Sequence, residues 1–110
     1  MIIFHNANLL DLNVLTAVTF LERAGGLLFR SKLNMNEVLY LKPCNSVHTL
    51  GMKYSIDVVY LNRAGIIIKV IDGMKPYRAS YCTSSKTVLE FISGVAKKMN
   101  LRVGDQLLIK

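Results

Sequence analysis

Two apolar runs separated by a short turn constrain the fold of this chain more than any other feature. Residues Ser55–Leu61 and Ile66–Ile71 are rich in β-branched side chains, and the segment Asn62–Gly65 joins them. Runs of this length and composition favour β-strands, and a four-residue loop that contains glycine favours an antiparallel hairpin. Both runs carry more apolar residues than a strand with one solvated face requires. We therefore predict that this hairpin lies at the centre of a sheet.

Short strand patterns and turns alternate along the rest of the chain. Apolar and polar residues alternate from Leu10 to Val14, which predicts a strand with one face on a core. Pro43 cannot donate to a ladder and ends another predicted strand. Polar residues, glycine and proline predict loops over residues 44–54 and 72–85. The further predicted strands are Val38–Lys42, Val88–Ile92 and Gln106–Ile109.

Two short helices are also predicted. Thr19 and Glu22 have the spacing of a capping box, so a helix is expected to begin after Thr19 and to cover residues 20–29. Ser93 is the expected N-cap of the second helix, Gly94–Met99. About six or seven strands with two short helices predict a mostly β (β-rich α+β) domain, a small antiparallel sandwich or jelly-roll-like barrel.

Length and composition predict one domain over residues 1–110. A chain of 110 residues with 52% hydrophobic and 19% charged residues can bury a single core. The N-terminal MIIF patch lacks the basic start and long apolar stretch of a signal peptide, and no run approaches the roughly 18 apolar residues of a transmembrane helix. The chain as it stands is therefore expected to be soluble and cytoplasmic.

The net charge of +7, from 14 basic and 7 acidic side chains, favours acidic partners. Only Lys97 and Lys98 are adjacent, and the basic residues lack the aromatic interleaving that is typical of base-stacking surfaces. A solvated basic surface is therefore favoured over nucleic-acid binding.

The loop from Cys44 to Met52 is the candidate site, because polar residues that can recognise a ligand gather there directly after a strand. The leading hypothesis is a binding or accessory module that recognises a small polar ligand or a partner segment. The alternative is a small hydrolase or transferase that uses His48 and Asp57 as an acid–base pair. The candidate ligand-binding residues are Cys44, Asn45, His48, Thr49 and, from a later loop, Arg78.

Asp57 interrupts an apolar strand on the face that carries Val59 and Leu61. A buried carboxylate needs partners, so Asp57 is expected to pair with an arginine or to accept hydrogen bonds from loop amides. Arg78 can likewise pair with an acid instead of binding a ligand. The predicted structural set is Arg23, Arg30, Asp57 and Glu90.

Two cysteines and one histidine could form a metal site if their loops meet. Cys44 and His48 are four residues apart and Cys82 lies in another loop, but the paired C-x-x-C spacing of structural zinc sites is missing. A disulfide and a Cys44–His48–Asp57 triad are further alternatives. Two thiols with no disulfide between them, and no metal or cofactor, are the favoured outcome.

Five ordered sequence blocks resemble a known family. They are R-x-x-GLL-x-R from Arg23, PCNSVHT-x-GM from Pro43, IDVVYL from Ile56, P-x-R with VLE at Pro76 and Val88, and G-x-A with GD at Gly94 and Gly104. The chain resembles the bacterial and archaeal family catalogued as domain of unknown function 192. The resemblance implies a compact, mostly β, jelly-roll-like domain without an established reaction. Many relatives are exported, and some lie near genes for secretion or pilus assembly, which implies partners of that kind.

Overall fold

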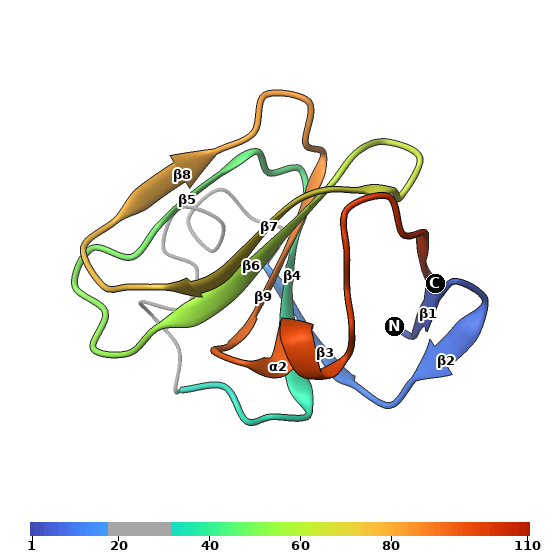
Figure 1. Cartoon of the computed structure of the whole chain (residues 1–110), viewed down its shortest axis with the longest axis horizontal. Helices are drawn as coiled ribbons and strands as arrows, with labels where there is room; N and C mark the ends of the chain where they lie inside the picture. Colours follow the sequence, from blue (N-terminus) through green and yellow to red (C-terminus); the bar gives the residue numbers. More distant parts are fainter. Residues whose placement is uncertain (18–31) are drawn as a thin grey trace.

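The computed structural model describes residues 1–17 and 32–110, which form three β-sheets and one short helix (Figure 1). The largest sheet has five strands in the order β3-β4-β9-β6-β7. These strands are β3 Asn13–Ala17, β4 Glu37–Leu41, β9 Thr87–Ile92, β6 Ile56–Leu61 and β7 Ile67–Met74. The mostly β prediction is confirmed, and the jelly-roll-like sandwich stays a prediction. The predicted antiparallel pairing holds for the other neighbours in this sheet, but β3 and β4 pair in parallel, and the described strands form no closed barrel.

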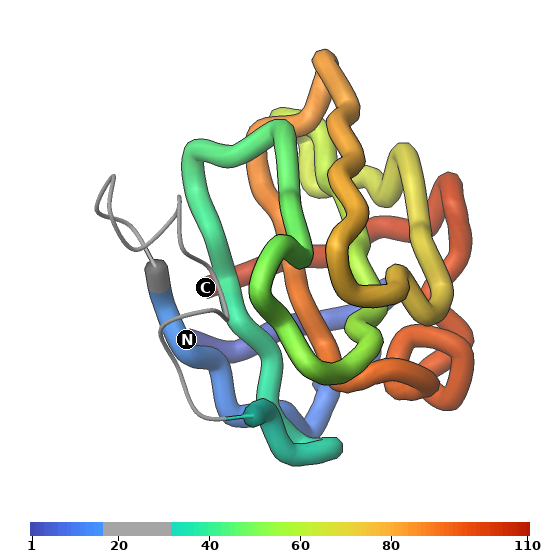
Figure 2. The backbone as a smooth tube through the Cα atoms, turned by 90° about the vertical axis from the view of Figure 1, so that its left-hand side faces the viewer, coloured from blue at the N-terminus to red at the C-terminus, as the bar shows by residue number. Residues whose placement is uncertain are grey.

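Two smaller sheets lie on either side of the five-stranded sheet. The first has the order β10-β1-β2, with β10 Leu107–Ile109, β1 Ile3–His5 and β2 Asn8–Leu10. The second, called the ribbon from here on, pairs β5 Ser46–His48 with β8 Ala79–Tyr81. In Figure 2 the ribbon and its flanking loops face the viewer.

The predicted hairpin is confirmed, but its place in the sheet is only half right. β6 and β7 pair antiparallel, and all six residues of β6 are buried. β7 is an edge strand, however, and β9 takes the central position between β4 and β6. β9 can lie there because Val88, Leu89 and Phe91 are fully buried and supply apolar side chains to both faces.

Three boundary predictions were wrong. The strand expected over Leu10–Val14 is two strands, because the Leu12 N–H donates to the Leu10 carbonyl (3.0 Å) and turns the chain between them. Asp72 and Gly73 do not end β7, which runs to Met74 through an irregular register. The loops expected at 44–54 and 72–85 contain β5 and β8.

Each face of the five-stranded sheet packs on its own core. Val59 and Leu61 of β6 point into the helix-side core, together with β1, β10 and the helix α2 (Val95–Lys98). Val58 and Tyr60 point into the ribbon-side core, which Val47 of the ribbon helps to close. This alternation follows from the period of two along a strand. Both faces of the sheet are therefore buried, which explains its near-continuous apolar strands.

Helix α2 overlaps the predicted second helix, Gly94–Met99. The expected Ser93 cap is wrong, because Gly94 is the N-cap residue and no side chain of the cap bonds the helix. The first predicted helix, residues 20–29 with the Thr19 cap, lies outside the described residues. In the described part of the chain no helix is long and apolar enough to cross a membrane.

Candidate functional site

Thr49 joins the two loops at one end of the ribbon. Its hydroxyl donates to the Lys75 carbonyl (2.7 Å) and accepts from the Arg78 N–H (2.8 Å). Its own N–H donates to the Arg78 carbonyl (2.8 Å), and its carbonyl accepts from the Tyr77 N–H (2.9 Å). Thr49 is 0% exposed. Sequence reasoning placed Thr49 among the ligand contacts, whereas its observed bonds position residues 75–78.

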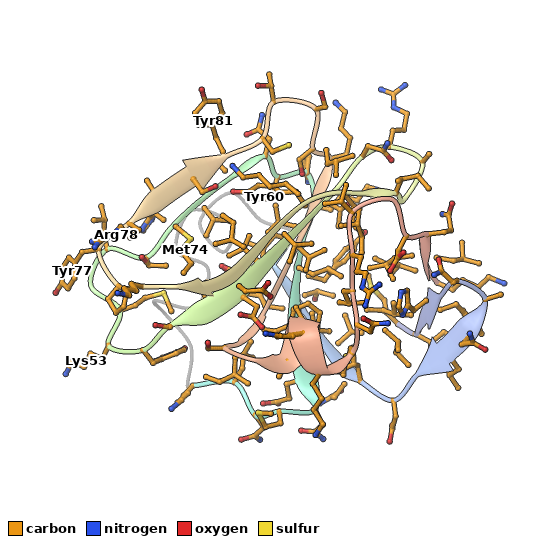
Figure 3. All side chains as sticks on the ribbon, viewed as in Figure 1. Lys53, Tyr60, Met74, Tyr77, Arg78 and Tyr81 are labelled. Carbon is orange, nitrogen blue, oxygen red and sulfur yellow. The ribbon has the colours of Figure 1, made fainter. Side chains whose placement is uncertain are left out.

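Tyr77 and Arg78 are the side chains that this junction presents to solvent. Tyr77 is 65% exposed and has a φ of 61°, a left-handed conformation that is uncommon outside glycine. The Arg78 guanidinium is exposed and its Nη1 lies 3.3 Å from the Tyr77 carbonyl oxygen. Figure 3 shows Lys53, Tyr77 and Arg78 at the same end of the molecule. Tyr77 was absent from the sequence-based candidates, and adjacency to Arg78 is the signal that could have found it.

His48 lies on β5 just before this junction and is half-buried. Its Nδ1 accepts a hydrogen bond from the Leu50 N–H at 3.3 Å. The imidazole therefore uses one nitrogen to hold the local backbone.

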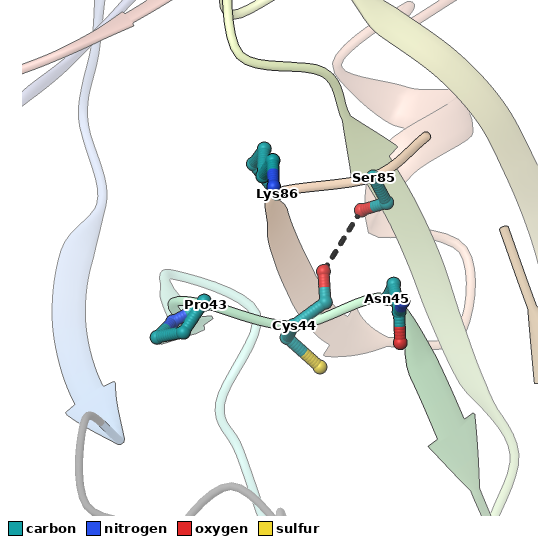
Figure 4. A pocket seen from close by; sticks show the side chains of 5 residues that line it. All are labelled: Pro43, Cys44, Asn45, Ser85 and Lys86. Carbon is teal, nitrogen blue, oxygen red and sulfur yellow. Dashed lines mark hydrogen bonds between the residues drawn. The ribbon is translucent and has the colours of Figure 1, made fainter. Parts of the chain in front are cut away.

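Cys44 and Asn45 lie at the other end of β5, so that strand divides the predicted ligand-binding residues into two groups. Together with Pro43, Ser85 and Lys86 they line a shallow hollow of about 180 Å³ (Figure 4). The buried Ser85 hydroxyl donates to the Cys44 carbonyl (3.0 Å), and the Cys44 thiol donates to the Ser46 carbonyl (3.2 Å). The hollow is therefore bounded largely by backbone that is already hydrogen-bonded.

Asp57 is 0% exposed and lies on the helix-side face of β6. One carboxylate oxygen accepts from the Gly73 N–H (2.8 Å), and the other accepts from the N–H groups of Gly94 (2.8 Å) and Ala96 (3.0 Å). Asp57 thus caps α2 from a neighbouring strand and fixes the irregular part of β7. The bonded amides come from residues distant in sequence, not from the turn before β6.

His48 and Asp57 lie on opposite sides of the five-stranded sheet. Val47, the neighbour of His48, packs into the ribbon-side core, whereas Asp57 bonds α2 in the helix-side core. The geometry of the described residues therefore does not bring the predicted acid–base pair together.

Glu90 is a second buried acid, 2% exposed, on the ribbon-side face of β9. Burial raises the pKa of its carboxyl group from 4.5 to about 7. Its Oε2 has no hydrogen-bond partner among the described residues. The same holds there for the buried hydroxyls of Tyr54, Tyr60 and Ser80. The sequence analysis did not single out these three hydroxyls. The position of Glu90 inside the apolar run Val88–Ile92 is the feature that could have indicated polar groups nearby.

The remaining predicted residues do not form a metal centre with these groups. In residues 1–17 and 32–110, no group of three or more histidine, cysteine or acidic side chains is placed to hold a metal ion. Cys44 and Cys82 are both half-buried at the border of the ribbon-side core. Arg23 and Arg30 lie outside the described residues.

Solved protein structures share this fold. A protein of unknown function from Novosphingobium aromaticivorans DSM 12444 matches with a TM-score of 0.84 and 18% sequence identity, over 98% of this chain and 82% of that chain. A putative transcription regulator from Sinorhizobium meliloti 1021 matches with a TM-score of 0.83 and 18% identity, over 97% and 89%. At this identity the similarity shows the fold alone. No curated protein matches the chain significantly.

The family of domain of unknown function 192, whose description reads "Uncharacterized ACR", provides the remaining match. Its model covers residues 1–109, nearly the whole chain. The match includes the block from Pro43 that carries Thr49, the strand that carries Asp57 and the strand that carries Glu90. The chain therefore belongs to the family of domain of unknown function 192.

Proposed function

We propose that this domain is a non-enzymatic binding or accessory module, and that the loops joined by Thr49 recognise an anionic group. That group belongs to a small polar ligand or to an acidic partner segment. The observation that carries the proposal is the set of hydrogen bonds from Thr49 to Lys75, Tyr77 and Arg78. A surface whose backbone is already fixed loses little conformational entropy when a ligand binds.

The charge of the ribbon supports an anionic ligand. Residues 42–54 and 75–86, which contain the ribbon and its flanking loops, include no aspartate or glutamate. Asp57 and Glu90 are buried, so neither neutralises this surface. A surface of one sign attracts ligands of the opposite sign and speeds their association. The cationic residues of these two segments are Lys42, Lys53, Lys75, Arg78 and Lys86.

The exposed Tyr77 ring supports recognition beyond charge. A non-glycine residue with a φ of 61° is strained, and such residues persist where the surrounding structure holds them. Here the Tyr77 N–H donates to the buried Thr49 carbonyl. Tyrosine and arginine are among the residue types that contribute most binding energy at protein–protein interfaces. We therefore assign Tyr77 and Arg78 to direct contact with the ligand and Thr49 to their positioning.

The alternative of a hydrolase or transferase is less well supported. It needs His48 and Asp57 within reach of one substrate, but Asp57 accepts three backbone hydrogen bonds in the helix-side core.

Binding of a fluorescein-labelled oligoglutamate peptide tests the proposal at low salt. The variant Lys75→Gln/Arg78→Gln is expected to weaken binding about tenfold, because both charges lie at the proposed surface. The matched control is Lys97→Gln/Lys98→Gln, which removes the same charge from exposed residues on α2. The control is expected to change binding by less than about twofold. Equal loss in both variants would show a non-specific charge effect and overturn the proposal.

A further inference from the structure

The sheet β10-β1-β2 has one face in a core and one apolar face that is open to solvent. Ile3 of β1 and its partners on β2 and β10 pack in the helix-side core. The next residue, Phe4, is paired with Leu9 of β2 and with Leu108 of β10. Successive side chains of a strand point to opposite faces, so this row lies on the face away from the core. Leu9 is 62% exposed and Leu108 is 47% exposed.

Ile2 extends this exposed apolar row along β1. It lies two positions before Phe4, and its N–H donates to the Lys110 carbonyl (2.8 Å), so it continues the same sheet. Contiguous apolar side chains on a surface are typical of protein–protein contacts. Figure 1 shows β1 and β2 at the opposite end of the molecule from the ribbon. An inference about this face therefore does not rest on the proposed loop surface.

The charge of this sheet differs from that of the rest of the chain. Residues 1–12 and 105–110, which contain its three strands, carry two acidic side chains and one basic side chain. The other residues carry 13 basic and 5 acidic side chains. Two copies of so basic a chain repel one another where their basic surfaces meet, and this repulsion is weakest between two such sheets. The three charged residues of the sheet are Asp11, Asp105 and Lys110.

We infer that the exposed face of the sheet β10-β1-β2 binds the same face of a second copy of this chain, in a dimer whose twofold axis runs along β1 between the two sheets. A twofold contact joins one surface to itself, so the surface must be self-complementary. Rotation about this axis places β2 of one copy over β10 of the other. Leu9 then faces Leu108 of the second copy, and the two Phe4 rings face each other. Sheets that pack in this way keep their strands nearly aligned, about 10 Å apart.

The charges beside the row favour this axis over others. Asp11 directly follows β2 and is exposed. Lys110 directly follows β10, and its Nζ lies 5.8 Å from the centre of the Phe4 ring, over the same face. Both charges lie at the end of the sheet where β1 begins, because β2 and β10 run antiparallel to β1. An axis along β1 therefore brings Asp11 of each copy opposite Lys110 of the other, whereas an axis across the strands separates them.

Sedimentation equilibrium of the wild-type chain, from about 20 µM to about 1 mM, tests the inference. Three short strands form a small interface, so we expect a transient dimer with a dissociation constant on the order of 100 µM. Leu9→Asn should weaken the dimer at least about tenfold, because each dimer then loses two buried leucines. The matched control is Leu50→Asn, which changes a leucine of similar exposure near the ribbon and should leave the dissociation constant unchanged. A wild-type chain that stays monomeric, or an equal loss in both variants, would overturn the inference.

Charge reversal tests the orientation of the two copies. Asp11→Lys and Lys110→Asp each place like charges opposite one another, so each variant alone should self-associate at least about fivefold more weakly than wild type. A mixture of the two variants should recover wild-type affinity, because both contacts then join opposite charges. Titration of ¹⁵N-labelled Asp11→Lys with unlabelled Lys110→Asp measures this recovery, and the amide shifts should be largest in β1, β2 and β10. A mixture that does not recover affinity, or shifts that are largest in the ribbon, would contradict the proposed dimer.

Discussion

Two buried acids on opposite faces of the five-stranded sheet differ in the number of hydrogen bonds that they accept. Asp57 of β6 is paired with Phe91 of β9, and the next residue, Val58, is paired with Glu90. The two acids are therefore near neighbours in the sheet, but they point into different cores. Asp57 accepts three backbone hydrogen bonds, whereas Glu90 Oε2 has no partner in the described residues. The two carboxyl groups are thus buried to nearly the same extent, but only that of Asp57 has hydrogen-bond partners for both oxygens.

The contrast follows from what packs against each face. Helix α2 begins beside Asp57, and the N–H groups at a helix start have no partner within the helix. An acid at that point accepts hydrogen bonds from these N–H groups, so both the carboxylate and the start of the helix gain partners. On the other face, the hydroxyls of Tyr60 from β6 and Ser80 from the ribbon are, like Glu90 Oε2, without hydrogen-bond partners among the described residues. Asp57 is therefore part of the scaffold, whereas the burial of Glu90 is not offset by backbone donors of this kind.

Removal of Asp57 should have the largest effect on stability. In Asp57→Ala, the N–H groups of Gly73, Gly94 and Ala96 lose their acceptor inside the protein, and we expect a loss of about 4 kcal/mol. Urea denaturation followed by circular dichroism measures this change.

Asp57→Asn is the matched control, because it keeps one acceptor oxygen and a similar shape. It should lose less stability than Asp57→Ala. Stability unchanged in Asp57→Ala would mean that the observed hydrogen bonds do not hold α2, and the contrast with Glu90 would disappear.

The raised pKa of Glu90 should make the free energy of unfolding depend on pH. Its pKa is about 7 when folded and 4.5 in the reference state, so the unfolded chain loses this proton first as pH rises. Below about pH 4 the Glu90 carboxyl group is protonated in both the folded and the unfolded state. Between pH 4.5 and 7 the free energy of unfolding falls, and above pH 7 this decrease is complete. One pKa unit corresponds to about 1.4 kcal/mol, so the total is about 3 kcal/mol.

Glu90→Gln should abolish this part of the pH dependence, because the amide does not titrate. The informative quantity is the difference in unfolding free energy between wild type and variant at each pH, since the other titrating groups contribute equally to both. A difference that stays constant from pH 4 to 8 would contradict the raised pKa of Glu90 and with it the contrast between the two acids.

The parts of the fold that local sequence predicts are those with strong apolar patterns. β4, β6, β7 and β9 were all found because each carries a run of β-branched or large apolar residues. β5 and β8 were missed because each has only three residues, and β8 contains Ser80 between two exposed residues. Their pairing joins segments more than 30 residues apart, which no local pattern encodes.

The contacts of the candidate-site residues also depend on segments that are distant in sequence, so local patterns do not predict them. Residue types predicted that Asp57 is buried and partnered, but not that its partners are Gly94 and Ala96, because those amides approach only when α2 folds against β6. Thr49 was expected to contact a ligand on the basis of its hydroxyl. The hydroxyl instead bonds Lys75 and Arg78, which lie 26 and 29 residues away along the chain.

Substitution of Thr49 should have an intermediate effect. Thr49→Val preserves the shape of the side chain but removes the bonds to the Lys75 carbonyl and the Arg78 N–H, so we expect a loss of about 1–2 kcal/mol. Thermal denaturation measures it, with Thr49→Ser as the control that keeps the hydroxyl. If both variants match wild type, the junction is held by the backbone bonds alone, and Thr49 does not resemble Asp57 as a scaffold residue.

Substitution of His48 should have the smallest effect. The imidazole is half-buried on β5, and its Nδ1 accepts the Leu50 N–H at 3.3 Å, the long end of the range for a hydrogen bond. Leu50 is exposed, so water can replace this acceptor in His48→Ala. We therefore expect a change in unfolding free energy below about 0.5 kcal/mol, measured in the same urea titration as Asp57→Ala. If His48→Ala were the destabilising variant and Asp57→Ala the silent one, the histidine would be the scaffold residue and the acid the accessible one.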